Sequence, residues 1–276
     1  MPNTTTQNTY FIVLIGGPGI AAPCDSHHDQ TWKDYVVPIQ LATKNSQVSL
    51  KPGETMQWWI YGPAYRERWL NDSQAKVPAG LSPKFSHTKP SQQQIKEVTD
   101  LRKTGAVDYI DRIKAAAAAI GASVVVLEKP DDFWAQLQKL PDHSLNRLWY
   151  IGHASNDGLM LKLIHTDDPT AGACIPAANQ ADMIRVPALQ EKGAQVISKF
   201  TNQGEPSKFY GCFTYAFAQQ WNRVFHRAAA GAVNKIDFSV INQPSTFPQI
   251  MPRLEKSEAN TGWTQFPAAA ASPRVR

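Results

Sequence analysis

The sequence predicts an α/β protein with a mostly parallel sheet, helices on both faces and a long insertion after the first strand. Short apolar, β-branched runs alternate with stretches in which apolar residues recur at helical spacing. The clearest run covers residues 148–151, which Gly152 ends and His153 follows. A continuous apolar run of this kind is typical of a strand that is buried on both faces.

The bulk composition is that of a globular chain that can bury a core. Its 276 residues are 42% apolar. The net charge of +5 comes from scattered residues without a long basic run, so we expect no nucleic acid partner. The apolar run at 10–15 is too short for a signal peptide or a membrane span. We therefore expect a cytoplasmic protein, or one exported without a classical signal peptide.

The first strand is expected at residues 10–15, followed by a glycine-rich turn at 16–19. This turn lacks the GK[ST] and GxGxxG patterns of phosphate-binding loops, so a tight turn is the favoured interpretation. Residues 20–95 follow no clear pattern and are predicted to form an irregular insertion or subdomain. An aromatic patch at 58–61 is expected to pack this insertion onto the sheet.

The rest of the chain alternates between helices and strands. Helices are expected at 91–120, 131–140, 187–200 and 213–228, and strands at 123–127, 148–151, 159–164, 207–210 and 236–241. Together these elements predict a single domain over residues 1–244, followed by an irregular tail at 245–276.

His153 and Cys212 each follow a short strand and a glycine. If their strands are neighbours in a parallel sheet, the two side chains lie together at the carboxyl edge, as a thiol nucleophile and its base must. A helix beginning after Cys212 would favour the thiolate, and Thr214 is a candidate to cap it. The main-chain amides of Ala154 and Cys212 are candidates for an oxyanion hole.

The cysteine and histidine content indicates neither a disulfide framework nor a metal site. The chain has three cysteines, Cys24, Cys174 and Cys212, and no CxxC motif. No histidine and cysteine pattern has zinc-ligand spacing. The adjacent His27 and His28 are expected in a solvated loop rather than around one ion. We therefore expect no metal and no other cofactor.

This arrangement resembles the caspase-like (clan CD) cysteine peptidases, in which the histidine follows one strand and the cysteine follows the next. The separation of His153 from Cys212 is close to the roughly 50 residues found in caspases. The stretch Phe209-Tyr210-Gly211-Cys212, followed by Phe217-Ala218-Gln219, is similar to bacterial caspase-like and CHAT-like domains, a group that includes self-cleaving toxin domains. The resemblance covers residues 10–16 and 120–241.

The resemblance implies a caspase-like three-layer sandwich and an endopeptidase that acts on a peptide or protein substrate. His153 and Cys212 would be the catalytic dyad, and the protein would act as a bacterial effector or toxin. The chain departs from the family at Ala154, where glycine is usual, and lacks the pattern QAC[RQG]G around Cys212. Asp25 and Asp157 are the acidic candidates for substrate binding, and an acidic pocket would imply cleavage after Lys or Arg.

Two other interpretations stay open. The turn at 15–19 resembles the oxyanion-hole turn of α/β-hydrolases such as proline iminopeptidases, although the chain lacks their G-x-S-x-G motif. Cysteine and histidine are also common as buried structural residues, so the alternative is a non-catalytic ligand- or protein-binding α/β domain. The sequence leaves the substrate, the mode of activation and the oligomeric state open.

Overall fold

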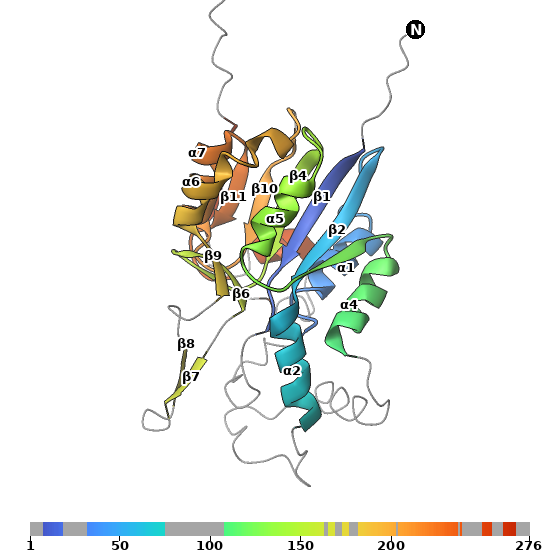
Figure 1. Ribbon diagram of the computed structural model, residues 1–276, viewed down its shortest axis with the longest axis vertical. Helices are drawn as coiled ribbons and strands as arrows, with labels where there is room; N and C mark the ends of the chain where they lie inside the picture. Colours follow the sequence, from blue (N-terminus) through green and yellow to red (C-terminus); the bar gives the residue numbers. More distant parts are fainter. Residues whose placement is uncertain are drawn as a thin grey trace, which may run out of the picture.

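The computed structural model has an α/β fold built on a seven-stranded mixed sheet in the order β12-β11-β10-β4-β1-β2-β3 (Figure 1). All neighbouring strands are parallel except β11 and β12, which are antiparallel. The predicted fold class is therefore confirmed. The structure describes residues 8–18, 32–74, 108–162, 165–168, 173–176, 182–202, 204–236, 238, 250–255 and 262–268.

The strands of this sheet are β1 (Thr9–Ile15), β2 (Glu54–Tyr61), β3 (Ser123–Leu127), β4 (Leu145–Ile151), β10 (Ser207–Tyr210), β11 (Ala229–Ala232) and β12 (Trp263–Phe266). β4 is buried along its whole length, because strands on both sides and helices on both faces shield it. From β1 the chain adds β2 and β3 on one side, then crosses to place β4 on the other. This reversal between β1 and β4 is a topological switch point, and ligands of such sheets bind at the carboxyl ends of the strands there.

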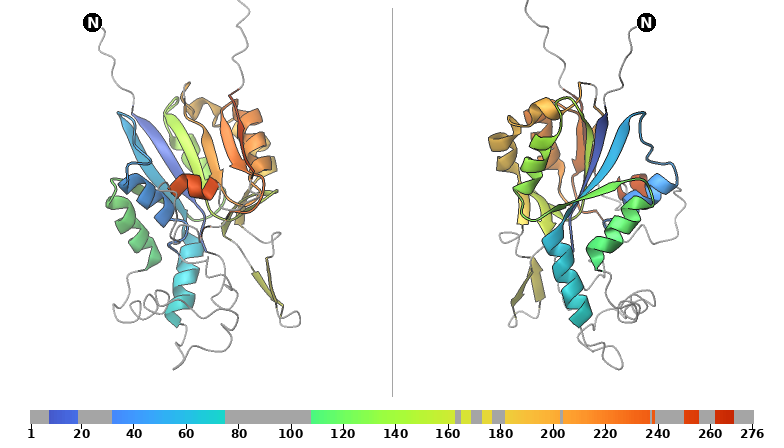
Figure 2. Two further views of the ribbon diagram at one scale, coloured as in Figure 1. Left: turned by 180° about the vertical axis from the view of Figure 1, so that it is seen from behind. Right: turned by 45° about the vertical axis from the view of Figure 1, so that its right-hand side comes forward.

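Helices cover both faces of the sheet (Figures 1 and 2). Alternate residues of β1 point to opposite faces, with Phe11 and Val13 on one and Ile12 and Leu14 on the other. The first face packs against α1 (Val37–Lys44), α4 (Tyr109–Ala118) and α8 (Ile250–Glu255). The second face packs against α5 (Asp132–Lys139), α6 (Val186–Gly193) and α7 (Tyr215–Phe225).

The remaining elements lie around the carboxyl edge of the sheet. Helix α2 (Gly62–Gln74) continues directly from β2 (Figure 1). A small antiparallel sheet follows β4 and consists of β5 (Ala154–Ser155), β6 (Gly158–Lys162) and β9 (Asp182–Arg185), while β7 (His165–Asp168) pairs with β8 (Ala173–Pro176). The short 3-10 helix at Ile197–Lys199 lies instead beside the amino end of β4, where the N–H of His143 donates to the carbonyl of Ser198 at 2.8 Å. None of the described helices combines the length and the apolar character needed to cross a membrane.

The expectation of an irregular insertion at residues 20–95 is wrong for its described part, 32–74. This part contains α1, the inner strand β2 and α2. The aromatic patch lies within β2, where Trp58 and Trp59 are buried on opposite faces of the sheet. From the sequence, the consecutive tryptophans were interpreted as a patch that packs the insertion onto the sheet. An inner strand of a sheet covered by helices can instead bury large side chains on both of its faces.

The C-terminal part also differs from expectation. Residues 229–232 form strand β11, where no strand was predicted. This strand needs small residues, because a Cβ atom on Gly231 would lie 2.7 Å from the carbonyl oxygen of Thr214. The tail at 245–276 is not wholly irregular, since it supplies α8 and the edge strand β12. Of the strand predicted at 236–241, Ile236 lies outside any strand, and 237 and 239–241 lie outside the described residues.

One predicted helix is shorter than expected, and another is described only in part. The helix expected at 187–200 is α6, which ends at Gly193, followed by a turn. The helix expected at 91–120 is described only from its later part, where Asp108 caps α4 by accepting a hydrogen bond from the N–H of Asp111 at 2.8 Å. The strand predicted at 159–164 is β6, and residues 163 and 164 lie outside the described part.

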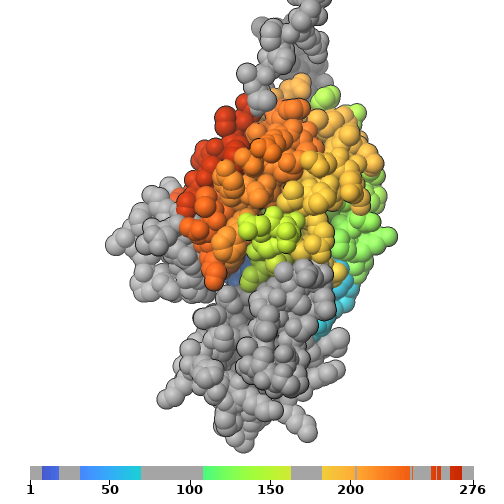
Figure 3. Space-filling model, turned by 90° about the vertical axis from the view of Figure 1, so that its left-hand side faces the viewer, coloured from blue at the N-terminus to red at the C-terminus, as the bar shows by residue number. Residues whose placement is uncertain are grey.

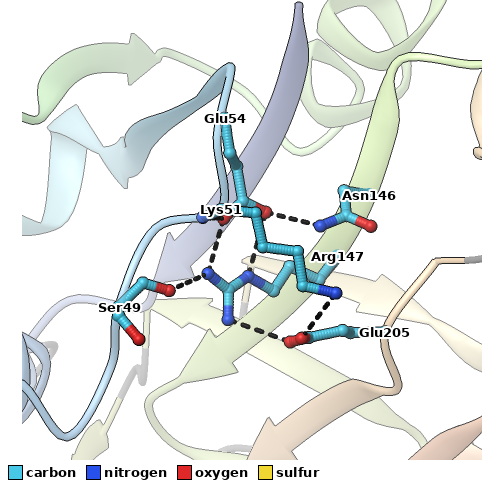
Figure 4. Close-up of polar contacts among 6 residues, drawn as sticks. All are labelled: Ser49, Lys51, Glu54, Asn146, Arg147 and Glu205. Atoms are coloured by element: carbon cyan, nitrogen blue, oxygen red, sulfur yellow. Dashed lines mark hydrogen bonds and ion pairs between the residues drawn. The ribbon is translucent and has the colours of Figure 1, made fainter. Parts of the chain in front are cut away.

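The amino edge of the sheet is closed by a buried ion pair between Arg147 of β4 and Glu54 of β2 (Figure 4). Both side chains are almost fully buried, with exposed fractions of 5% and 0%. The guanidinium donates to both carboxylate oxygens of Glu54, at 3.0 and 2.6 Å, and to the carbonyl of Ser49 at 2.7 Å. The Nη1 group of Arg147 donates to the carboxylate of Glu205 at 2.9 Å, and Lys51 forms an ion pair with the Glu205 carboxylate at 2.8 Å.

This network satisfies the buried charges that it contains. The amide of Asn146 donates to Glu54 at 2.7 Å, and the guanidinium lies 4.0 Å from the centroid of the Phe11 ring. Burial alone would raise the pKa of Glu205, but the hydrogen bond from Lys51 and the charge of Arg147 outweigh it and leave that pKa lowered. The amino edge is thus held by charges whose partners all belong to the chain itself.

Candidate active site

The register of the sheet brings the turns that carry His153 and Cys212 to the same edge. β10 is the neighbour of β4, and Tyr210 is paired with Ile151. The N–H of Gly152 continues the ladder by donating to the carbonyl of Tyr210 at 3.0 Å. Two steps along each chain from the pair of Ile151 and Tyr210 lead to His153 and Cys212. Both residues therefore leave the carboxyl edge at the same level, and β4 borders the switch point.

Glycines allow the turns after these strands to approach closely. A Cβ atom on Gly152 would lie 2.6 Å from the hydroxyl of Tyr150 and 3.0 Å from the Cα atom of Gly16. A Cβ atom on Gly211 would lie 2.8 Å from both the carbonyl oxygen of Gly152 and the Cβ atom of Ala154. The two glycines that end these strands are therefore required by the packing that joins the turns.

Tyr35 holds the imidazole of His153. Its hydroxyl oxygen lies 2.6 Å from Nε2, and the two rings meet edge to face with centroids 5.4 Å apart. Tyr35 is fully buried, and its ring also contacts Phe238 at 5.2 Å between centroids. Sequence reasoning missed this residue, because nothing in the pattern before α1 indicates an approach to a histidine 118 positions away.

Tyr150 holds the main chain at His153. Its hydroxyl donates to the carbonyl oxygens of His153 and, at 2.7 Å, of Met160. Burial raises the pKa of Tyr150 well above its ordinary value, and the nearby charges of Cys212 and Tyr65 raise it further. Tyr150 is therefore a neutral donor at physiological pH.

The sulfur of Cys212 lies against the main chain of Ile236. The N–H of Ile236 donates to Sγ at 3.4 Å, and the S–H group of Cys212 donates to the carbonyl oxygen of the same residue at 3.8 Å. The next residue, Phe213, has a φ of +58° and donates its N–H to the carbonyl of Asn234 at 2.9 Å. A left-handed aromatic residue is strained, and such strain clusters at functional turns.

Thr214 does not cap helix α7, contrary to expectation. Its hydroxyl donates to the carbonyls of Phe209 at 2.7 Å and Gly211 at 3.0 Å, and it accepts the N–H of Ala232 at 3.0 Å. No side-chain cap bond forms at the start of α7. The hydroxyl instead ties the turn that carries Cys212 to strand β11, because buried carbonyl groups there need a donor.

Ala154 presents its amide away from the β5–β6 hairpin. It is paired with Leu159, and the adjacent hydrogen bond runs from the N–H of Met160 to the carbonyl of His153 at 2.9 Å. Ala154 thus occupies a non-hydrogen-bonded position of the antiparallel pair, so its N–H is directed away from β6. In Figure 3 the yellow-green surface of this segment borders the orange surface of the chain that follows β10.

The proposed acidic substrate-binding residues are not brought to this pair by any described contact. Asp157 lies in the exposed turn between β5 and β6, where its N–H donates to the hydroxyl of Ser155 at 3.2 Å. Asp25 lies outside the described residues, as do Cys24, His27 and His28. Cys174 falls within β8, but its side chain is not described. Within the described residues, no three His, Cys, Asp or Glu side chains gather into a possible metal site.

The glycine-rich turn after β1 uses its amides within the chain. The N–H of Gly16 donates to the carbonyl of Ile151 at 2.9 Å, and the N–H of Gly17 donates to that of Leu161 at 2.8 Å. Pro18 has no N–H. A Cβ atom on Gly17 would lie 2.4 Å from that of Ala64. The described part of this turn is therefore a tight packing turn and offers no N–H group to an oxyanion.

Comparison with known proteins identifies no relative of the chain: no family model matches it, and no curated protein matches its sequence. The resemblance to caspase-like peptidases therefore rests on the two short motifs around His153 and Cys212. What the site can do chemically has to be argued from the contacts of these two residues.

Proposed function

We propose that this protein is a cysteine-dependent hydrolase, an endopeptidase in which Cys212 is the nucleophile and His153 the general base. The observation that supports the proposal is the register of β4 and β10, neighbouring strands that end at the same level of the carboxyl edge, each two residues before His153 or Cys212. A catalytic dyad requires that the base and the nucleophile come from segments that meet in one place. Here, one segment carries an imidazole and the other a thiol, and both follow strands that end in glycine at one edge of the sheet.

The proposed reaction is acyl transfer through a thioester. His153 takes the proton of Cys212, and the thiolate attacks the carbonyl carbon of the scissile peptide bond. The tetrahedral oxyanion that forms is stabilised by N–H groups, for which Ala154 and Cys212 are the candidates. Collapse of this intermediate breaks the C–N bond, and His153 returns the proton to the leaving amine. Water, activated by His153, then hydrolyses the thioester and regenerates the thiol.

The surroundings of the pair support this proposal. The main chain of Ile236 holds the sulfur of Cys212 through two hydrogen bonds, and the Ala154 amide is directed away from β6. The resemblance to bacterial caspase-like domains extends the proposal to a peptide or protein substrate and to a role as an effector or toxin. Such a protein would act in the cytoplasm or after export without a classical signal peptide.

The proposal is tested by the reactivity of the three cysteines in the full-length protein. Iodoacetamide modifies thiolates, and peptide mapping by mass spectrometry follows each cysteine separately. At pH 7 we expect Cys212 to react at least about tenfold faster than Cys24 and Cys174, and we expect His153→Ala to abolish that advantage. His226→Asn, at the exposed C-terminal end of α7, is the matched control and should leave the advantage intact.

Peptide-bond cleavage is then measured on a mixed peptide library. We expect cleavage by the wild type and none by Cys212→Ala, which should fold normally. A non-catalytic binding domain predicts the opposite result: Cys212 would react no faster than the other cysteines, and Cys212→Ala would behave as the wild type. Equal growth of hosts that express the wild type and Cys212→Ala would contradict a toxic role for this site.

A further inference from the structure

We infer that Tyr35 is a positioning residue for this reaction: its hydroxyl binds Nε2 of His153 and leaves Nδ1 as the nitrogen that accepts the thiol proton. The inference rests on the proposed function and goes beyond it, because it assigns a third residue and a tautomer to the site. The observation that carries it is the 2.6 Å hydrogen bond between the two side chains.

Tyr35 is held so that its hydroxyl stays at this position. It lies in the turn before α1, where the N–H groups of Val36 and Val37 donate to the carbonyl of Lys33 at 3.0 and 2.8 Å. The side chain has no solvent exposure, so water does not compete for its hydroxyl. Edge contacts with the rings of His153 and Phe238 restrict the phenol further.

The chemistry of imidazole gives this hydrogen bond a direct consequence. A neutral histidine carries a proton on one ring nitrogen, and only the other nitrogen can act as a base. When Nε2–H donates to the oxygen of Tyr35, the lone pair is on Nδ1. After Nδ1 has taken the proton of Cys212, the Nε2–H group of the imidazolium still donates to Tyr35, now as a charge-assisted hydrogen bond. With the Tyr35 oxygen as the acceptor, this hydrogen bond favours both the productive tautomer and the charged form.

Tyr35 also contacts the segment that binds the sulfur. Its ring packs on Phe238, two residues after Ile236, whose N–H donates to Sγ of Cys212. Substitution by phenylalanine keeps these ring contacts and removes the hydroxyl alone. Tyr35→Phe thus separates the role of the hydrogen bond from that of packing.

The matched control is Tyr65→Phe. Tyr65 is also fully buried, and its hydroxyl donates to a main-chain carbonyl, that of Gly16, at 2.8 Å. Both variants lose one buried hydroxyl, so we expect similar decreases in thermal unfolding temperature. Only Tyr35→Phe should slow the reaction of Cys212 with iodoacetamide at pH 7, by about 10- to 100-fold, by analogy with the loss of a group that orients a metal-binding histidine.

Nitrogen NMR of histidine-labelled protein provides a direct readout of the tautomer. The signals of His153 are assigned by their loss in His153→Ala. In neutral His153 of the wild type we expect a protonated Nε2 and an unprotonated Nδ1, and in Tyr35→Phe a mixture of the two tautomers. If Tyr35→Phe does not fold, the wild-type spectrum alone decides the tautomer.

The outcomes separate this inference from the proposed function. Equal slowing in Tyr35→Phe and Tyr65→Phe, or a wild-type His153 protonated on Nδ1, overturns the role of Tyr35 while Cys212 stays reactive and dependent on His153. A wild-type Cys212 that reacts no faster than Cys24 and Cys174 overturns the proposed function, and the inference with it.

Discussion

The two edges of the central sheet are held together by different chemistry. At the amino edge, Arg147 and Glu54 form a buried ion pair whose hydrogen bonds are satisfied within the chain (Figure 4). At the carboxyl edge, neutral groups hold the polar residues: Tyr35 binds His153, and the main chain of Ile236 binds Cys212. A buried ion pair is costly to break because removing one partner leaves the other charge unpaired, whereas a thiol and an imidazole held by neutral partners retain protons that can be transferred.

The largest expected effect is at the amino edge. Arg147→Met removes the partner of the buried Glu54 carboxylate, and we expect it to lower the free energy of unfolding by about 3–5 kcal/mol. Urea unfolding followed by fluorescence measures this loss. The double variant with Glu54→Leu should recover much of it, because it leaves no unpaired charge. Under native conditions Cys212 should keep its wild-type reactivity in these variants. If Arg147→Met lowers the free energy of unfolding by less than about 1 kcal/mol, the ion pair is not buried as described.

A smaller loss of stability, with a larger effect on the thiol, is expected from Gly211→Ala. The new Cβ atom would lie 2.8 Å from the carbonyl oxygen of Gly152, and we expect overpacking to cost about 1–3 kcal/mol. Because Gly211 precedes Cys212, the reaction with iodoacetamide should slow as well. Gly121→Ala is the matched control: its φ of +73° makes alanine unfavourable there, but no atom lies within 4 Å. A thiol slowed equally in both variants would rule out a specific effect of Gly211.

The smallest expected effect is a difference in alkaline stability. Burial raises the pKa of Tyr150 above the ordinary value of 10.0, so its contribution to stability is fully present below pH 10 and is lost as the pH rises toward the folded-state pKa. A buried tyrosine with a raised pKa makes the free energy of unfolding fall more steeply with pH, by up to about 1.4 kcal/mol per pH unit. Urea unfolding at pH 9 and pH 11 should therefore show a shallower loss in Tyr150→Phe than in the wild type.

The amino edge provides the control for this pH dependence. Arginine does not titrate in this range, so Arg147→Met should lose stability between pH 9 and pH 11 as steeply as the wild type. A Tyr150→Phe variant with an unchanged slope would show that the Tyr150 hydroxyl is not buried in the folded state.

Local sequence patterns predicted the elements in which buried residues recur at regular spacing or in a continuous run. β1 and β4 were recognised because continuous apolar runs mark strands buried on both faces. β11 was missed, because its sequence of alanines and one glycine favours a helix by local preference. Its strand conformation depends on the close approach of Thr214, a contact between segments that no local pattern reports.

The sequence by itself determined the α/β class and the positions of His153 and Cys212 after strands that end in glycine. Only the tertiary structure decided that β10 is the neighbour of β4, that Thr214 binds β11 instead of capping α7, and that Tyr35 reaches His153. The physical reason is that periodicity reports which residues are buried, whereas hydrogen bonds between distant segments depend on how the chain folds back on itself.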